Sequence, residues 1–208
     1  MSEKLGVNGL RTWNELNGRP CVTEDTDDRR KSICTSRSFA DMIEDEQELV
    51  LRVSDFAAMC AKKLREEGSA AYDVTTFIYT NRFREDMAQY FPSATVRLQV
   101  AANSTQEIVG AALKAFRTIF RHGYKYKKAG VTVSNIIETG SIQSSLFDFD
   151  EDLRRKQDRL SEVMDAVNVS GTMLRLASQR PGHYADGIRS DFRSRLYTTS
   201  LDDIIEIH

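Results

Sequence analysis

Residues 104–133 predict a helix, a turn and a strand in direct succession, and this combination restricts the fold more than any other stretch. The run Ser-Thr-Gln-Glu at 104–107 is a capping box, which marks a helix N-terminus. Apolar residues then recur at spacings of three and four, the period of a buried helix side: Ile108, Ala112, Ala115, Phe116 and Ile119. Gly123 ends the predicted helix, and a strand follows over 124–133. A one-sided helix next to a strand indicates a helix that covers one face of a sheet.

A second helix and three more strands complete the predicted domain. Residues 45–67 repeat the helical spacing, with acidic residues in the first turn and basic residues in the last, which complements the helix dipole. Residues rich in β-branched, aromatic and other β-tolerant side chains predict strands over 31–39 and 72–81. Residues 94–100 alternate between apolar and polar side chains, so we expect an antiparallel sheet with one face covered and one face wet.

The order of these elements predicts the fold class. Strand, helix and strand occur twice across residues 31–137, so we expect an α+β domain. Its four-stranded antiparallel sheet carries two helices on one face, in the order β-α-β-β-α-β. Residues 1–30 contain glycines and a proline that interrupt any period, and we expect an irregular linker from a partner domain. We expect residues 138–151 to be a polar tether and residues 152–208 to be a small, mostly helical or irregular C-terminal extension with a helix over 152–168.

One region of the chain is cationic, although the whole chain has a formal net charge of −2. No acidic residue occurs between Ile108 and Ile137. The cations in this window are Lys114, Arg117, Arg121, Lys125, Lys127 and Lys128. A polyanion, most simply a phosphate backbone, is the natural partner of such a region. For the helical cations alone, we favour the alternative that they form a solvated face.

The strand predicted over 31–39 adds small hydrogen-bond donors to this picture. Ser36 and Ser38 flank Arg37, and this mixture of hydroxyls and one cation suits contact with phosphate. An exposed edge strand made soluble by polar residues would have the same composition. The residues of the strand do not separate these two interpretations.

The last strand predicts an irregularity in the sheet. Tyr124 and Tyr126 share one face of a regular strand, whereas Val131 and Val133 have the other parity. A bulge near Ala129 and Gly130 would bring both pairs to the same side. Lys127 and Lys128 would then stand at the distortion, where both could reach one backbone.

The tether contains two large apolar residues in a polar setting. Leu146 and Phe147 are adjacent, and Gln143 precedes them at a fixed distance. Two such side chains in a tether are best explained as a peptide that docks into a groove on another protein. The alternative is that they fold back on the sheet.

The chain offers no catalytic constellation. Its histidines and cysteines match no metal-ligand or disulfide spacing, and it has no glycine-rich phosphate loop or nucleophile elbow. The acidic run at 148–152 could be imagined as a two-metal site, but a flexible tether favours a solubilising role. Widely spaced cysteines, no signal peptide and no membrane-length apolar run predict a cytoplasmic protein without a membrane partner. We therefore expect a binding module and not an enzyme.

Several motifs resemble one family when they are taken together. Residues 31–39 and 126–131 resemble the C-terminal part of Y-family translesion DNA polymerases, specifically the UmuC-like subunit of bacterial polymerase V. Residues 14–21 resemble the segment that leads out of that family's catalytic core. Residues 143–147 are similar to its sliding-clamp-binding peptide, and 196–199 resemble the UmuC-specific C-terminal extension.

This resemblance implies a fold, partners and site residues. It implies a little finger domain that grips the template-primer backbone in error-prone, SOS-type damage bypass. By position, the residues that contact DNA would be Ser36, Arg37, Ser38, Lys127 and Lys128, together with Lys125 and Arg82. The residues that enter the clamp groove would be Gln143, Leu146 and Phe147. DNA and the sliding clamp are the implied partners, with UmuD-like subunits and RecA as further ones.

The same resemblance implies which parts are missing. The carboxylates of the family's palm domain, which would bind magnesium, have no counterpart in these residues. We therefore expect a fragment that needs no cofactor and cannot polymerise DNA by itself, although its parent would be a DNA polymerase.

Two rival functions remain open at this level. An RNA-binding module could have the same strand order, with Tyr72, Phe77 and Tyr79 as stacking aromatics, although the usual glycine-aromatic signature is absent. A protein-interaction adaptor would bind no DNA at all. A competition between duplex primer-template and single-stranded RNA separates these readings.

Overall fold

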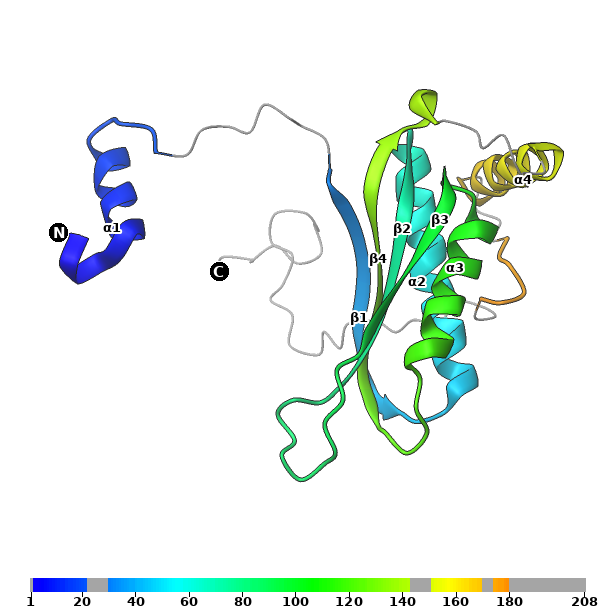
Figure 1. Cartoon of the computed structure of the whole chain (residues 1–208), viewed down its shortest axis with the longest axis horizontal. Coiled ribbons are helices and arrows are strands. Elements are labelled where there is room, and N and C mark those ends of the chain that lie inside the picture. The colour runs from blue at the N-terminus through cyan, green and yellow to red at the C-terminus, as the bar shows by residue number, and fades with distance from the viewer. Residues whose placement is uncertain (1, 22–29, 143–150, 170–173, 180–208) are drawn as a thin grey trace, which may run out of the picture.

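The structure, a computed structural model, describes residues 2–21, 30–142, 151–169 and 174–179 (Figure 1). The described part of the chain contains an α+β domain, as predicted. Its four strands are β1 (Ser32–Ile43), β2 (Ser69–Thr80), β3 (Ser93–Ala102) and β4 (Tyr126–Glu138). They form one antiparallel sheet in the order β1-β4-β2-β3. The last strand of the domain thus lies inside the sheet, between β1 and β2.

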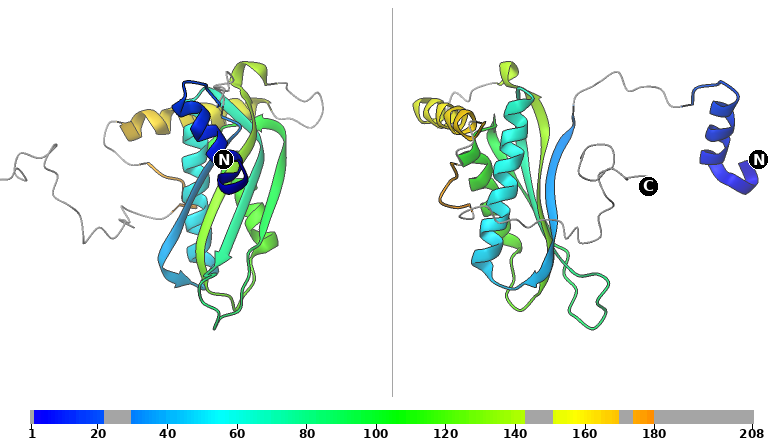
Figure 2. Two further views of the ribbon diagram at one scale, coloured as in Figure 1. Left: turned by 90° about the vertical axis from the view of Figure 1, so that its left-hand side faces the viewer. Right: turned by 180° about the vertical axis from the view of Figure 1, so that it is seen from behind.

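Two helices, α2 (Glu46–Glu66) and α3 (Thr105–Ile119), pack side by side on one face of this sheet (Figures 1 and 2). The chain therefore follows the expected β-α-β-β-α-β order. Both predicted helix starts are confirmed. The side chain of Asp45 accepts a hydrogen bond from the backbone N–H of Glu48 at 2.7 Å, and Ser104 Oγ accepts one from Glu107 at 3.4 Å. These caps satisfy N–H groups that have no partner inside the helix.

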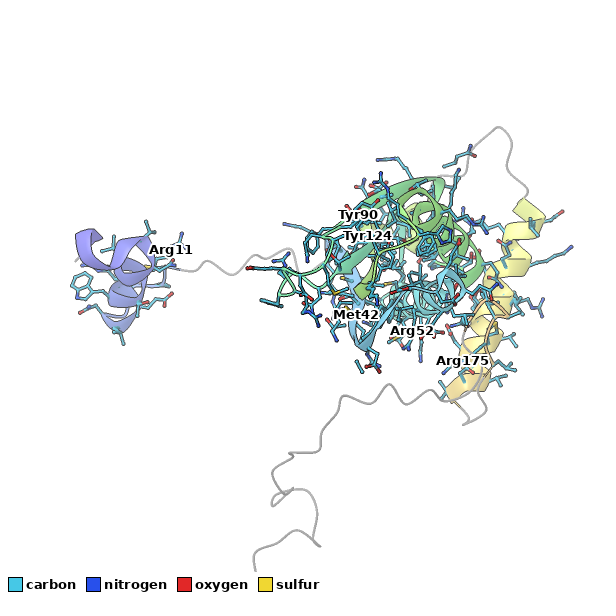
Figure 3. All side chains as sticks on the ribbon, turned by 90° about the horizontal axis from the view of Figure 1, so that it is seen from below. Arg11, Met42, Arg52, Tyr90, Tyr124 and Arg175 are labelled. Atoms are coloured by element: carbon cyan, nitrogen blue, oxygen red, sulfur yellow. The ribbon has the colours of Figure 1, made fainter. Side chains whose placement is uncertain are left out.

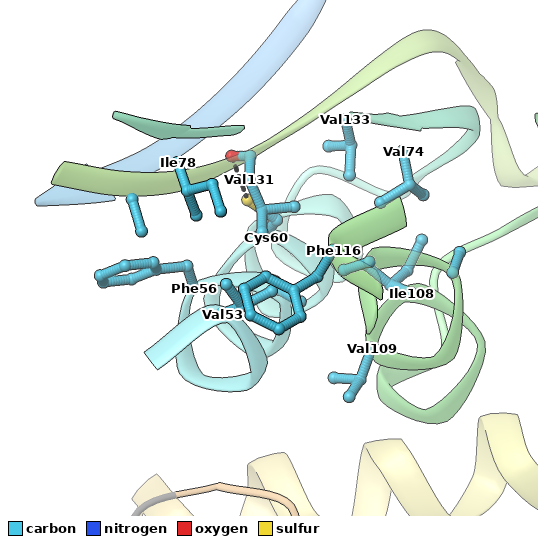
Figure 4. Close-up of a cluster of buried hydrophobic side chains, with 14 of the residues drawn as sticks. Val53, Phe56, Cys60, Val74, Ile78, Ile108, Val109, Phe116, Val131 and Val133 are labelled. Carbon is cyan, nitrogen blue, oxygen red and sulfur yellow. Dashed lines mark hydrogen bonds between the residues drawn. The ribbon is translucent and has the colours of Figure 1, made fainter. Parts of the chain in front are cut away.

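The core lies between the sheet and the two helices (Figure 4). The predicted stripe of α3 is buried in full. The largest fully buried side chains include Leu49, Val53 and Leu64 of α2, Ile108 and Phe116 of α3, and Val74, Ile78, Val131 and Val133 of the sheet. Cys60 is buried among them, as its place on the apolar stripe predicts, and its thiol lies 3.5 Å from the carbonyl of Val131. Burial raises the pKa of this thiol.

The end of α3 differs from the prediction. The helix ends at Ile119, and Gly123 instead makes the turn into β4 with a φ of 85°. Phe120 already has extended backbone angles, and its ring lies 5.4 Å from that of Phe116 and 5.9 Å from that of Tyr126. Because leaving the helix early allows this aromatic packing, tertiary contact overrides the local stop signal.

The N-terminal residues correct a prediction. Residues 1–30 were expected to be irregular, but Ser2–Leu16 forms helix α1. Only Gly6 departs from helical angles, with φ 63° and ψ −166°. Gly9 stays helical because a glycine inside a helix costs only about 1 kcal/mol relative to alanine. The role of this region as a linker remains a prediction.

The C-terminal extension begins with helix α4 (Glu151–Val169), close to the predicted 152–168. Several polar contacts join it to the domain. Arg65 of α2 donates from Nε and Nη2 to both carboxylate oxygens of Asp165, at 2.6 and 2.9 Å. Ser161 Oγ accepts a hydrogen bond from the backbone N–H of Thr105 at 3.3 Å. The apolar residues Leu160 and Val163 of this helix remain about half exposed. Residues 180–208 lie outside the described part.

No described helix is both long enough and apolar enough to span a membrane.

Candidate nucleic-acid interface

The face of the sheet opposite α2 and α3 is the candidate site. Side chains alternate along each strand, and cross-strand partners point to the same face. The strand register therefore collects one set of residues, which we call the open face: Ser32, Cys34, Ser36 and Ser38 of β1; Lys128, Gly130, Thr132 and Ser134 of β4; Asp73, Thr75, Phe77 and Tyr79 of β2; and Ser93, Thr95 and Arg97 of β3. The alternation predicted for 94–100 is confirmed, with its polar residues on this face.

The prediction of a bulge near Ala129 and Gly130 of β4 is wrong. Pairing runs regularly through Ala129 and Gly130 on both sides of the strand. The register instead shifts at Lys127, since Tyr79 pairs with Lys128 and Thr80 pairs with Tyr126. The shift brings Tyr126 to the buried side with Val131 and Val133, as the predicted bulge was meant to do.

Two local constraints explain this position. At Gly130 an added Cβ would stand 2.4 Å from the Phe77 ring and 2.4 Å from the Cβ of Ser36, so the neighbouring strands close tightly over the glycine. At the other end, the hydroxyl of Tyr126 donates to the carbonyl of Arg121 at 2.9 Å and accepts from its N–H at 3.1 Å. Burial raises the pKa of Tyr126. The irregularity therefore falls between these two anchors, at Lys127.

The two lysines at this shift have different surroundings. Lys128 lies on the open face, with its Nζ 5.9 Å from the centre of the Phe77 ring. Lys127 donates from Nζ to the carbonyl of Ala40 at 2.8 Å, across the irregular end of β1. Lys128 is therefore a cation of the open face on the inner strand β4, whereas Lys127 bonds to the end of the edge strand β1.

The predicted residues of β1 divide between the two faces. Ser36 and Ser38 lie on the open face beside Gly130 and Lys128. Arg37 pairs with the buried Ala129, so its side chain starts from the helix-covered side of this edge strand, where it is exposed. The structure thus brings Ser36, Ser38 and Lys128 together and separates Arg37 from them.

The cationic window is also divided, and the expectation of one local region is wrong. Lys114 and Arg117 are exposed on α3, which covers the other face of the sheet. Arg121 lies over the ring of Tyr90 at 4.9 Å, and Tyr90 lies beside Tyr124 (Figure 3). Lys125 forms an ion pair with Glu44 at 3.0 Å in the turn before β4. These cations are close in sequence but separated in the structure, because α3 and β4 belong to different layers.

Aromatic side chains to which the sequence gave no role in DNA binding lie on and beside the open face. Phe77 and Tyr79 are stacked with ring centres 4.9 Å apart, and Phe91 meets Tyr79 edge-on at 5.8 Å. We call Phe77, Tyr79 and Phe91 the aromatic row. Arg82 lies over the Phe91 ring at 5.5 Å. Phe77 and Tyr79 were considered only for RNA, and the period-two pattern of β2 could have placed both on the wet face.

A second cation on this face, Arg97, was predicted to face outward but was given no role. It lies over the ring of Tyr72 at 5.6 Å and 3.7 Å from Asp73. Asp73 is the only carboxylate among the residues of the open face, and it also accepts a hydrogen bond from Asn135 at 2.9 Å. The negative charge on this face is thus engaged by its neighbours.

The clamp-binding residues predicted from the sequence, Gln143, Leu146 and Phe147, lie outside the described residues. Within the described ranges, no three histidine, cysteine or acidic side chains gather as metal ligands would.

Comparison with known proteins supports this reading of the fold. Residues 30–146 match the impB/mucB/samB family C-terminal domain, and residues 158–207 match a domain of unknown function. The chain is 32% identical to the protein UmuC of Salmonella typhimurium over 95% of this chain and 47% of that protein. It is 32% identical to MucB of Escherichia coli over 80% of this chain and 39% of that protein.

A more distant relative carries an enzyme name. DNA polymerase IV of Staphylococcus aureus strain JH9 is 24% identical over 70% of this chain and 39% of its own length. The chain thus belongs to the impB/mucB/samB family and corresponds to the C-terminal part of a UmuC-like Y-family polymerase. It spans about half the length of the first curated relatives that it matches.

Proposed function

We propose that this chain is the non-catalytic DNA-binding and clamp-tethering region of an error-prone translesion DNA polymerase. Its open face would hold the phosphate backbone of the template-primer. The observation that carries the proposal is the group formed by Ser36, Ser38 and Lys128, where two hydroxyls of β1 lie beside one cation of β4 on the sheet face opposite α2 and α3. Hydroxyls and ammonium groups are the usual donors to phosphate oxygens. Asp73 does not oppose this role, because Arg97 and Asn135 engage it.

The remaining functions belong to the whole polymerase and its partners. Polymerisation, with magnesium in a palm domain, would lie in the parent protein and not in these residues. Gln143, Leu146 and Phe147 would enter the groove of the sliding clamp. UmuD-like subunits and RecA would be further partners in the cytoplasm. These assignments rest on the family and on the clamp-like motif.

The salt dependence of DNA binding tests the backbone role. Each phosphate that a lysine neutralises adds about 0.9 to the slope of log affinity against log salt concentration. We expect the double variant Lys127→Ala, Lys128→Ala to weaken binding of duplex DNA and to lower this slope by up to about 1.8. Fluorescence anisotropy with a labelled duplex at four salt concentrations measures both quantities.

A matched control changes the same charge on the other layer. Lys114→Ala with Arg117→Ala removes two cations from α3 and should leave affinity and slope within error of the wild type. Equal effects of the two double variants, or no effect of the lysine pair, would refute the assignment to the open face.

RNA binding is the second candidate, and the stacked pair Phe77 and Tyr79 is the observation that favours it. Single-stranded RNA is recognised mainly by stacking of unpaired bases on aromatic rings. Competition between unlabelled primer-template DNA and unlabelled RNA of the same length for one labelled duplex ranks the two candidates. We expect the DNA to compete better.

A further inference from the structure

The loop between β2 and β3 is held by its own side chains. Residues 81–92 leave the sheet after Thr80, whose N–H donates to the carbonyl of Tyr90 at 3.1 Å. The side-chain amide of Gln89 donates to the carbonyls of Asn81, Arg84 and Met87 at 3.2, 2.7 and 3.1 Å. The carboxylate of Asp86 accepts two hydrogen bonds from Arg84, at 2.8 and 2.7 Å. The loop therefore has a defined conformation, and the core anchors its end at Tyr90, whose hydroxyl donates to the carbonyl of Ile119 at 3.0 Å.

This loop presents a large aromatic side chain to water. Phe83 is 88% exposed, more than any other large hydrophobic residue that the structure describes. Its N–H donates to Asn81 Oδ1 at 3.1 Å, so the turn that displays the ring is itself hydrogen-bonded. A single exposed apolar residue is common on protein surfaces. The inference therefore depends on what surrounds Phe83.

The surroundings are a continuous series of cations and aromatic rings. The loop bends toward the side of the sheet that carries no helix, as opposite views show (Figures 1 and 2). Arg82, next to Phe83, lies over Phe91, and the aromatic row continues through Tyr79 to Phe77, above which stands Lys128. The series thus leads from Lys128 on the open face to the loop.

A row of aromatic rings with a cation at each end favours one class of ligand. Single-stranded nucleic acids bind to aromatic platforms that stack with bases, next to cations that hold the backbone. A protein partner would use the apolar area of Phe83 but would have no need of the cations beside it.

We propose that Phe83, with Arg82 and Phe91, stacks with an unpaired base of the template strand where it leaves the duplex. The proposal rests on the proposed function, because it places the duplex on the open face. It adds a second subsite that recognises unpaired bases and not the phosphate backbone.

Two DNA ligands separate the subsites. One is a blunt duplex, and the other is the same duplex with a 5′ template overhang of six nucleotides. Loss of one base-aromatic stack weakens binding by roughly 5- to 150-fold. We expect Phe83→Ala to lose affinity in this range for the overhang ligand, and to bind the blunt duplex within twofold of the wild type. Phe83→Trp should retain the preference for the overhang, and Phe83→Leu should lose it, because only a ring can stack.

Two control variants complete the design. Val169→Ala removes another highly exposed apolar side chain, at the end of α4, and should change neither affinity. Lys128→Ala should weaken binding of both ligands equally. If Lys128→Ala has no effect, the proposed function fails, whereas an effect of Lys128→Ala with none of Phe83→Ala overturns only the stacking subsite.

Three other results would also overturn the stacking subsite. Phe83→Leu could bind the overhang like the wild type, Phe83→Ala could weaken both ligands equally, or Phe83→Ala could lose retention on clamp-coated beads with DNA affinity unchanged. The last result would assign Phe83 to a protein contact. Thermal melting by circular dichroism should match the wild type, because the exposed ring supports no core.

Discussion

Gly130 shows how one residue controls the form of the open face. An alanine methyl at this position would stand 2.4 Å from both the Phe77 ring and the Cβ of Ser36. These neighbours lie on two different strands, so relief requires movement of both. The glycine is thus needed for space, because its backbone lies in a regular ladder with a strand on each side.

We predict that Gly130→Ala destabilises the domain by about 1–3 kcal/mol, the usual cost of overpacking. Urea unfolding followed by circular dichroism measures this change. Combining Gly130→Ala with Phe77→Ala should recover part of the lost stability, because Phe77→Ala removes the ring that the new methyl group meets.

Gly110 provides the matched control. It lies exposed on α3, and an added Cβ would meet nothing within 4 Å. Gly110→Ala should therefore stabilise the protein by up to about 1 kcal/mol through helix propensity. A Gly130→Ala variant as stable as the wild type would contradict the close packing of the open face.

Among the elements, helix α4 is joined to the domain by polar contacts. Its contacts with the domain include the paired Arg65 and Asp165, the hydrogen bond from Thr105 to Ser161, and one from Arg154 to the carbonyl of Ala101. Leu153 on its apolar side remains about half exposed. Leu160 and Val163 are also about half exposed, so little of the helix's apolar surface is buried and we expect α4 to detach before the sheet unfolds.

We predict that Asp165→Asn loosens α4 without unfolding the domain. The change leaves Arg65, whose side chain is only 12% exposed, without its charged partner. Charged hydrogen bonds of this kind contribute roughly 1.5–3 kcal/mol. Hydrogen exchange read by mass spectrometry should show faster exchange across 151–169 and unchanged exchange in β2 and β4.

Asp152→Asn is the control for that measurement. Asp152 pairs with Arg155 on the same helix, at 2.9 Å, and both side chains are largely exposed. Exposed pairs of this kind contribute about 0–1 kcal/mol. If both variants exchange at the same rate across α4, the contact with Arg65 does not hold the helix.

For the whole molecule, DNA binding and clamp binding are expected to use separate parts of the chain. The open face is built from residues 32–134, whereas the clamp-like motif lies at 143–147, outside the described residues. Two sites on one chain raise the effective concentration of each partner near the other. Nevertheless, substitutions in one site should weaken binding only of the partner that this site binds.

We predict that Leu146→Ala with Phe147→Ala abolishes retention on clamp-coated beads and leaves affinity for duplex DNA unchanged. The reason is that two apolar anchors in a short peptide supply most of its binding energy. Ser144→Ala, at a variable position of the motif, is the control and should bind the clamp normally. Retention of the double variant on the beads would remove the motif from the proposed function.

Local patterns in the sequence determined the elements of this domain. Three of these patterns involve only residues close together in the sequence, and each is confirmed: the cap at Ser104, the helical stripe around Ile108 and the alternation over 94–100. The fold class follows from the order of these elements. The family resemblance came from motif order in the same sequence, and the match over residues 30–146 confirms it.

Only the tertiary structure decided which side chains meet. The shift at Lys127 depends on two separate anchors. Gly130 is confined by Phe77 and Ser36, which are distant in sequence, and Tyr126 bonds to the backbone of Arg121 across a turn. Hydrophobic periodicity reveals neither contact. The same is true of Arg37, which the strand register places away from Ser36 and Ser38, and of the cations that α3 carries to the other layer. Periodicity reports the face of one element, whereas a site depends on how several elements pack.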